Sequence, residues 1–169
     1  MMLLAIIITT ISTLIQGTIS NYIGYTHQNL SLFFTLYVLI CLLIIQPYFD
    51  NKKKYFSLLI IFGLVIDITY TDTLFLNTSL FIIGYYFSKA FHFFFPYNLF
   101  TINISNLLSI FLYHIISFLF LSISQYDNYS IEVLLKVLSH SIIMTGIYTT
   151  ILYCTVLFIK EKLRLENVK

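Results

Sequence analysis

Six long apolar segments, separated by short polar turns, restrict this chain to few possible folds. The segments are residues 2–23, 30–47, 55–70, 73–95, 99–124 and 131–159. With 59% hydrophobic and only 9% charged residues, a chain of 169 residues cannot bury all of them in one water-soluble core. Segments of this length and polarity are instead typical of helices that cross a bilayer. The sequence therefore predicts an all-α, polytopic membrane protein with six transmembrane helices in one compact bundle.

The polar segments are too short to form a second folded domain. They cover residues 27–29, 50–54 and 125–130, together with the tail from residue 160. We therefore expect one transmembrane domain over residues 1–159 and a short basic cytoplasmic tail over residues 160–169. The N-terminal segment lacks the basic residues and the small-residue cleavage site of a secretory signal, so we expect it to remain as the first helix.

The positions of the basic residues predict the orientation of the bundle. Short loops that stay in the cytoplasm keep lysine and arginine, whereas exported loops lack them. The turns around His27, Asp72 and Asp127 contain neither, and Lys136 is the one outward exception, with Glu132 four residues before it as an ion-pair partner. The remaining basic residues follow the second segment, lie near the end of the fourth or follow the sixth: Lys52, Lys53, Lys54, Lys89, Lys160, Lys162, Arg164 and Lys169. We therefore expect a multi-pass protein of the cytoplasmic membrane with both termini in the cytoplasm.

Polar residues recur every three or four positions in three of the apolar segments, which places them on one face of each predicted helix. In a bilayer such faces mark contacts between helices. They could also line a cavity, as in a transporter, and the pattern leaves both interpretations open. The residues are Thr9, Thr13, Gln16, Ser20 and Gly24 in the first segment, Asn103, Asn106, Ser109, Tyr113 and Ser117 in the fifth, and Ser139, Gly146, Thr150 and Tyr153 in the sixth.

A carboxylate, Asp67, lies inside the third apolar segment. Because a charge there costs about 2.5–3.5 kcal/mol on insertion scales, it is expected to face protein or water and to have a partner. Gly63 and Thr71 share its helix face, and Asn77 lies about one turn into the fourth helix, within reach. Thr71 or Asp72 can cap the N-terminus of that helix. We call these five residues the polar corner and expect it either to bind a partner or to form a structural network.

The sequence carries no pattern typical of catalysis or of metal binding. The four histidines include no pair at i, i+4 and no HExxH, and the chain contains no CxxC, no GxSxG and no glycine-rich phosphate loop. Cys41 and Cys154 both lie inside apolar segments, far from any turn. We therefore expect a protein that is not an enzyme, with no cofactor, no metal site and no nucleic-acid partner.

The residues around the polar corner resemble the signature of the MreD family of rod-shape-determining membrane proteins, in the shorter form of low-GC Gram-positive bacteria. The matching positions are Gly63-Leu64, Asp67-Ile68, Tyr70-Thr71, Leu74 and Leu76-Asn77. The length, the six-helix pattern and the basic tail agree with this resemblance over the whole chain. The sequence departs from the pattern at Phe75, where many members have glycine, and at Asn29, where proline is common.

The resemblance implies a non-enzymatic component of the bacterial cell-elongation machinery. Proteins of this family bind MreC and connect the MreB filament system to peptidoglycan synthases of the RodA and penicillin-binding class. The alternative is the small-molecule-binding membrane subunit of an energy-coupling-factor vitamin transporter, which has a similar size and also six helices. Such subunits generally carry an Ala-x-x-x-Ala motif on the first helix, whereas here Ala5 is followed by Thr9, and they tend to use tryptophan, which this chain lacks.

Overall fold

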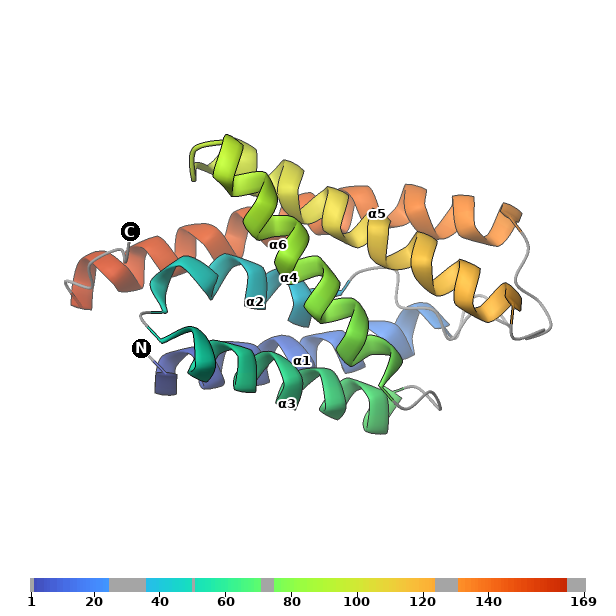
Figure 1. Ribbon diagram of the computed structural model, residues 1–169, viewed down its shortest axis with the longest axis horizontal. Coiled ribbons are helices and arrows are strands. Elements are labelled where there is room, and N and C mark those ends of the chain that lie inside the picture. Colours follow the sequence, from blue (N-terminus) through green and yellow to red (C-terminus); the bar gives the residue numbers. More distant parts are fainter. Residues whose placement is uncertain (1, 25–35, 50, 71–74, 124–130, 164–169) are drawn as a thin grey trace.

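The described residues of this protein fold into helices only. The computed structural model describes residues 2–24, 36–49, 51–70, 75–123 and 131–163. They form α1 (Met2–Gly24), α2 (Tyr37–Ile45), a 3-10 turn η1 (Gln46–Tyr48), α3 (Lys52–Tyr70), α4 (Leu76–Phe94), α5 (Leu99–Ile123) and α6 (Ile131–Leu163) (Figure 1). The all-α prediction is confirmed for this part of the chain.

Helix boundaries differ from the predicted ones at several places, including the starts of α3 and α4 and the end of α6. α3 begins at Lys52 and not at residue 55, because the Asn51 side chain accepts a hydrogen bond from the Lys53 amide at 2.9 Å and caps the helix. α4 begins at Leu76, three residues later than expected. α6 continues to Leu163, four residues into the predicted tail, since lysine and glutamate are good helix formers and cations suit a helix C-terminus.

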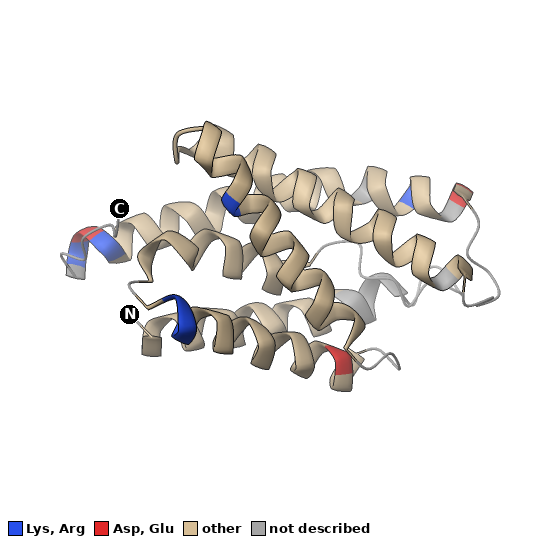
Figure 2. Ribbon diagram, viewed as in Figure 1, with Lys and Arg blue, Asp and Glu red and all other residues tan. Residues whose placement is uncertain are grey.

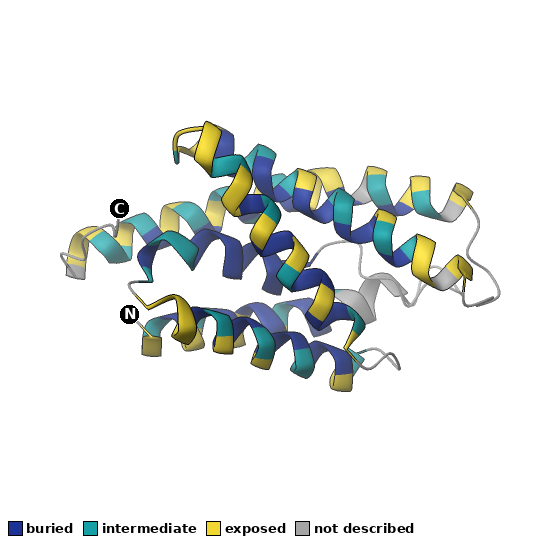
Figure 3. Ribbon diagram, viewed as in Figure 1, coloured by how far each residue is buried: buried dark blue, intermediate teal, exposed yellow. Residues whose placement is uncertain are grey.

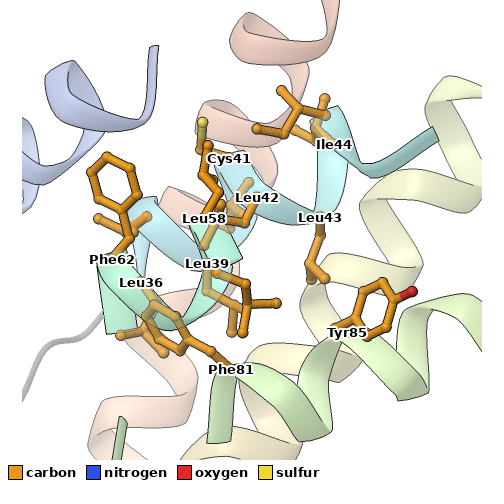
Figure 4. Close-up of a cluster of buried hydrophobic side chains, with 14 of the residues drawn as sticks. Leu36, Leu39, Cys41, Leu42, Leu43, Ile44, Leu58, Phe62, Phe81 and Tyr85 are labelled. Atoms are coloured by element: carbon orange, nitrogen blue, oxygen red, sulfur yellow. The ribbon is translucent and has the colours of Figure 1, made fainter. Parts of the chain in front are cut away.

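α2 is the centre of the bundle. All nine of its residues are buried, and it packs against α1, α4, α5 and α6 (Figure 3). Around it, Leu58 and Phe62 of α3 and Phe81 of α4 contribute to the same apolar cluster (Figure 4). A helix that is apolar on every side is typical of the interior of a helical protein. The described part of the second predicted segment is therefore a core helix about 14 Å long, at 1.5 Å per residue.

Three helices are long and apolar enough to cross a bilayer. The qualifying stretches are Met2–Ile19 of α1, Leu99–Phe120 of α5 and Leu134–Lys162 of α6. α3 and α4 have 19 residues each and reach about 29 Å, close to the roughly 30 Å hydrocarbon core, but they contain more charged and polar residues. These three stretches identify the chain as a membrane-protein candidate by length and composition.

Polar side chains line the contacts between helices. Thr9, Thr13 and Gln16 are buried on the predicted face of α1. On α5, Asn106 donates through Nδ2 to Thr149 Oγ1 of α6 at 3.3 Å. These polar faces are therefore helix contacts, as expected for side chains that hydrogen-bond across helices in a membrane.

The predicted polar face of α6 is confirmed only in part. Ser139 is exposed, whereas Asn103 Nδ2 of α5 donates to Thr150 Oγ1 at 3.3 Å. A neighbouring row of small polar residues, Ser141, Thr145 and Thr149, is fully buried and was not predicted. Near the start of α6, Lys136 and Glu132 form the expected exposed ion pair at 3.3 Å.

Candidate functional site: the polar corner between α3 and α4

The Asp67 carboxylate is buried at the junction of α3 and α4 and is 1% exposed. Its Oδ1 accepts hydrogen bonds from the backbone N of Asn77 at 2.9 Å and from Asn77 Nδ2 at 3.0 Å. Its Oδ2 accepts from the backbone N of Thr78 at 3.1 Å and from Thr78 Oγ1 at 2.6 Å. A carboxylate has about four acceptor positions, so these four bonds already satisfy the group.

These bonds make Asp67 the cap of α4, supplied from the neighbouring helix. Asn77 and Thr78 are the second and third residues of α4, and their amides are the ones that an N-cap side chain normally satisfies. The residue at the N-cap position, Phe75, has no acceptor in its side chain and makes no capping bond. The negative charge also suits the positive end of the helix dipole. We had expected Thr71 or Asp72 to cap this helix, and both lie outside the described residues.

Gly63 allows α3 and α4 to approach closely beside this cap. A Cβ atom at Gly63 would lie 2.8 Å from Thr78 Cα and 2.9 Å from Thr78 Oγ1. Since the first of these neighbours is backbone, it cannot move aside without shifting α4. The structure therefore brings Gly63, Asp67 and Asn77 together.

Phe75, immediately before α4, has a left-handed backbone with φ 66° and ψ −2°. Among the described residues it is the one non-glycine residue with positive φ. This conformation costs a residue with a Cβ about 1–2 kcal/mol, and glycine is the usual choice there. The Phe75 ring is 62% exposed, so packing offsets little of this cost.

Two tyrosines connect the polar corner to other helices. Tyr113 of α5 donates a hydrogen bond to Asn77 Oδ1. Tyr70, at the end of α3, donates to the Thr13 carbonyl of α1 at 3.3 Å, and its ring lies directly against Gly17. The corner thus joins four helices: α1, α3, α4 and α5.

Thr78, Tyr113 and Gly17 also take part in this site, although the sequence did not predict them there. Tyr113 belonged to the predicted polar face of the fifth segment, and only the packing of α5 on α4 brings it to Asn77. Asn77 and Thr78 stand together at the start of an apolar run. This pattern is typical of a helix start and could have indicated a role for Thr78.

A second buried cap repeats this arrangement between α1 and α2. Gln16 Oε1 of α1 accepts a hydrogen bond from the Val38 amide, at the second residue of α2, at 3.2 Å. The residue at the N-cap position of α2, Leu36, again has no acceptor in its side chain and makes no capping bond. In both pairs, a buried polar side chain on one helix therefore satisfies an amide at the start of the next.

The geometry of the polar corner supports a structural role for Asp67. Its carboxylate is buried, and it accepts four hydrogen bonds from Asn77 and Thr78 of the same chain. No group of three or more histidine, cysteine, aspartate or glutamate side chains in the described part of the chain could hold a metal ion. Of the two roles left open by the sequence, the structural network fits these contacts.

The chain was also compared with known proteins. No protein-family model, no curated protein and no solved structure matches it.

Proposed function

We propose that this protein is a non-enzymatic membrane component of the bacterial cell-elongation machinery that resembles MreD. It regulates cell shape and lateral peptidoglycan synthesis by binding MreC and linking it to synthases of the RodA and penicillin-binding class, and indirectly to MreB. In this proposal the polar corner holds the helices in place, and the partner binds to another surface of the bundle.

The observation that carries this proposal is the conformation of Phe75. It stands where many members of the resembled family have glycine, and its backbone adopts the left-handed region that glycine favours. The other motif residues agree, because Gly63 lies at a close helix contact and Asp67 and Asn77 bond to each other. The resemblance thus coincides with a specific backbone geometry and does not rest on apolar composition alone.

We further propose that all six helices cross the membrane, with both termini in the cytoplasm. The start of α1, the lysine-rich start of α3 and the basic end of α6 lie at one end of the bundle (Figures 1 and 2). This asymmetry supports the orientation, since cytoplasmic ends keep basic residues.

Depletion of the protein in its host tests this function. Cells that lose it should widen or become round, and side-wall synthesis should lose its normal position. Affinity purification of the protein in mild detergent should recover MreC. Depleted cells that keep their width and wall pattern would contradict the proposal.

A small-molecule-binding subunit of an energy-coupling-factor transporter is the second candidate. The observation that favours it is a set of buried polar atoms with no hydrogen-bond partner in the described residues: Gln16 Nε2, Ser117 Oγ and Thr145 Oγ1. Such atoms normally bond to water or to a ligand. If depleted cells keep their shape but lose uptake of one vitamin, this candidate replaces the first.

A further inference from the structure

Four exposed phenylalanines lie where α4 ends and α5 begins. We call Phe93, Phe94, Phe95 and Phe100 the phenylalanine patch. Phe93 is 83% exposed and Phe94 is 77% exposed, and their rings contact each other with centroids 5.2 Å apart. Exposed apolar clusters of this kind mark a surface that is covered by a lipid bilayer or by another molecule.

The patch lies at the basic end of the bundle. Tyr97, within the same turn, donates a hydrogen bond to the Ile44 carbonyl near the end of α2, at 2.8 Å. On α4, Tyr85 contacts the ring of Tyr55, which directly follows the three lysines of α3, with centroids 5.2 Å apart. The turn between α4 and α5 therefore lies at the same end of the bundle as the lysine-rich start of α3 (Figures 1 and 2).

Two observations indicate that a bilayer surface covers the patch. The apolar stretch of α5 that can cross a membrane begins at Leu99 and includes Phe100, so the patch continues directly into it. Lys89 is exposed on α4, one turn before Phe93 and on the same face. A lysine beside bulky apolar side chains is typical of helix surfaces in the interfacial region, where the chain is buried and the ammonium reaches the headgroups.

We propose that the phenylalanine patch inserts into the interfacial region of the cytoplasmic leaflet, with Lys89 among the lipid headgroups. The patch anchors the end of α4, a helix that is less apolar than the three qualifying stretches of α1, α5 and α6. The choice of leaflet rests on the proposed orientation, whereas insertion of the patch needs only that the chain lies in a membrane and therefore holds for either candidate function.

Tryptophan fluorescence tests the proposal directly, because the chain contains no tryptophan. Phe94→Trp is reconstituted in lipid nanodiscs that carry a doxyl quencher either near the headgroups or near the chain ends. Leu108→Trp, nine residues or about 14 Å beyond Leu99 at the start of α5, serves as the control for deep lipid contact. Lys162→Trp, exposed at the end of α6, serves as the control for water contact and should be quenched by iodide.

The proposal predicts that Phe94→Trp is quenched more by the headgroup-proximal label than by the deep label, and only weakly by iodide. Leu108→Trp should show the opposite preference between the two labels. If Phe94→Trp instead behaves like Lys162→Trp, the patch faces water and fits a cytoplasmic protein, and the proposal is wrong. Deep quenching like that of Leu108→Trp also contradicts it. Phe93→Trp probes the same surface if Phe94→Trp does not accumulate.

Discussion

At the scale of single residues, Phe75 is a strained position whose replacement should stabilise the protein. Phe75→Gly removes the Cβ that makes φ 66° unfavourable, and it sacrifices little packing because the ring is exposed. We expect a gain of about 1 kcal/mol in unfolding free energy, reduced by the greater freedom of glycine in the unfolded chain. Thermal unfolding of the purified protein in detergent would measure this gain as a higher midpoint.

Phe75→Ala is the matched control for this prediction. Alanine also removes the ring but keeps the Cβ, so the backbone strain remains. Its midpoint should stay at or below that of the wild type. If both variants stabilise the protein equally, the exposed ring and not the backbone is the source of the effect.

The sequence predicted part of the chemistry at Asp67. The energetic cost of a buried charge required a partner, and spacing alone brought Asn77 within reach. The participation of Thr78 and Tyr113 depends on where α4 begins and on how α5 packs, and neither is encoded in local spacing. Thr71 and Asp72, also predicted for this site, lie outside the described residues.

At the scale of helices, close packing of α3 on α4 depends on Gly63. In Gly63→Ala the new Cβ would meet Thr78 Cα at 2.8 Å, so α4 would have to move and the bonds to Asp67 would lengthen. We expect a loss of about 1–3 kcal/mol, the range for overpacked interiors. A lower thermal unfolding midpoint of the purified variant in detergent would measure this loss.

Gly146→Ala provides the opposite case in α6. No atom lies within 4 Å of a Cβ at this position, and alanine favours a helix over glycine by up to about 1 kcal/mol. This variant should therefore be as stable as the wild type or more stable. Equal destabilisation by the two substitutions would show that the contact at Gly63 is not the cause.

The all-helical fold of the described residues could be predicted from the sequence because the apolar segments are long and the turns short. The position of α2 in the interior of the bundle could not be predicted from the sequence. A continuous apolar run does not tell whether a helix faces lipid or the interior of a bundle, and burial on every side of α2 shows the interior position for its described part. The contact face of α6 was predicted only in part, since two neighbouring rows of polar residues share the same spacing and both reach α5.

At the scale of the whole molecule, the proposed six crossings predict which residues face outward. In a background without Cys41 and Cys154, single cysteines at His27 and Asp127 should react with an impermeant thiol reagent on intact protoplasts. A cysteine at Asn51, beside the lysines of α3, should react only after the membrane is permeabilised. Labelling at Asn51 on intact protoplasts, or none at Asp127, would contradict the topology.

The polar corner ties the bundle together, because Asp67 holds α4 while Asn77 and Tyr70 reach α5 and α1. Asp67→Asn keeps the shape of the side chain but has one acceptor oxygen, so its amide NH2 would oppose donors of Asn77 or of Thr78. Hydrogen bonds to a charged group contribute about 1.5–3 kcal/mol each, and unmatched buried donors add to the loss. The variant should therefore destabilise the whole bundle.

The thermal unfolding midpoint of purified Asp67→Asn in detergent tests this claim most directly. Glu132→Gln is the matched control, because it also removes one carboxylate but from an exposed ion pair worth about 0–1 kcal/mol. We predict that Asp67→Asn unfolds at a clearly lower temperature than the wild type, while Glu132→Gln unfolds with it. If Asp67→Asn unfolds at the wild-type temperature, the buried carboxylate does not hold these helices together, and a structural role for the polar corner is wrong.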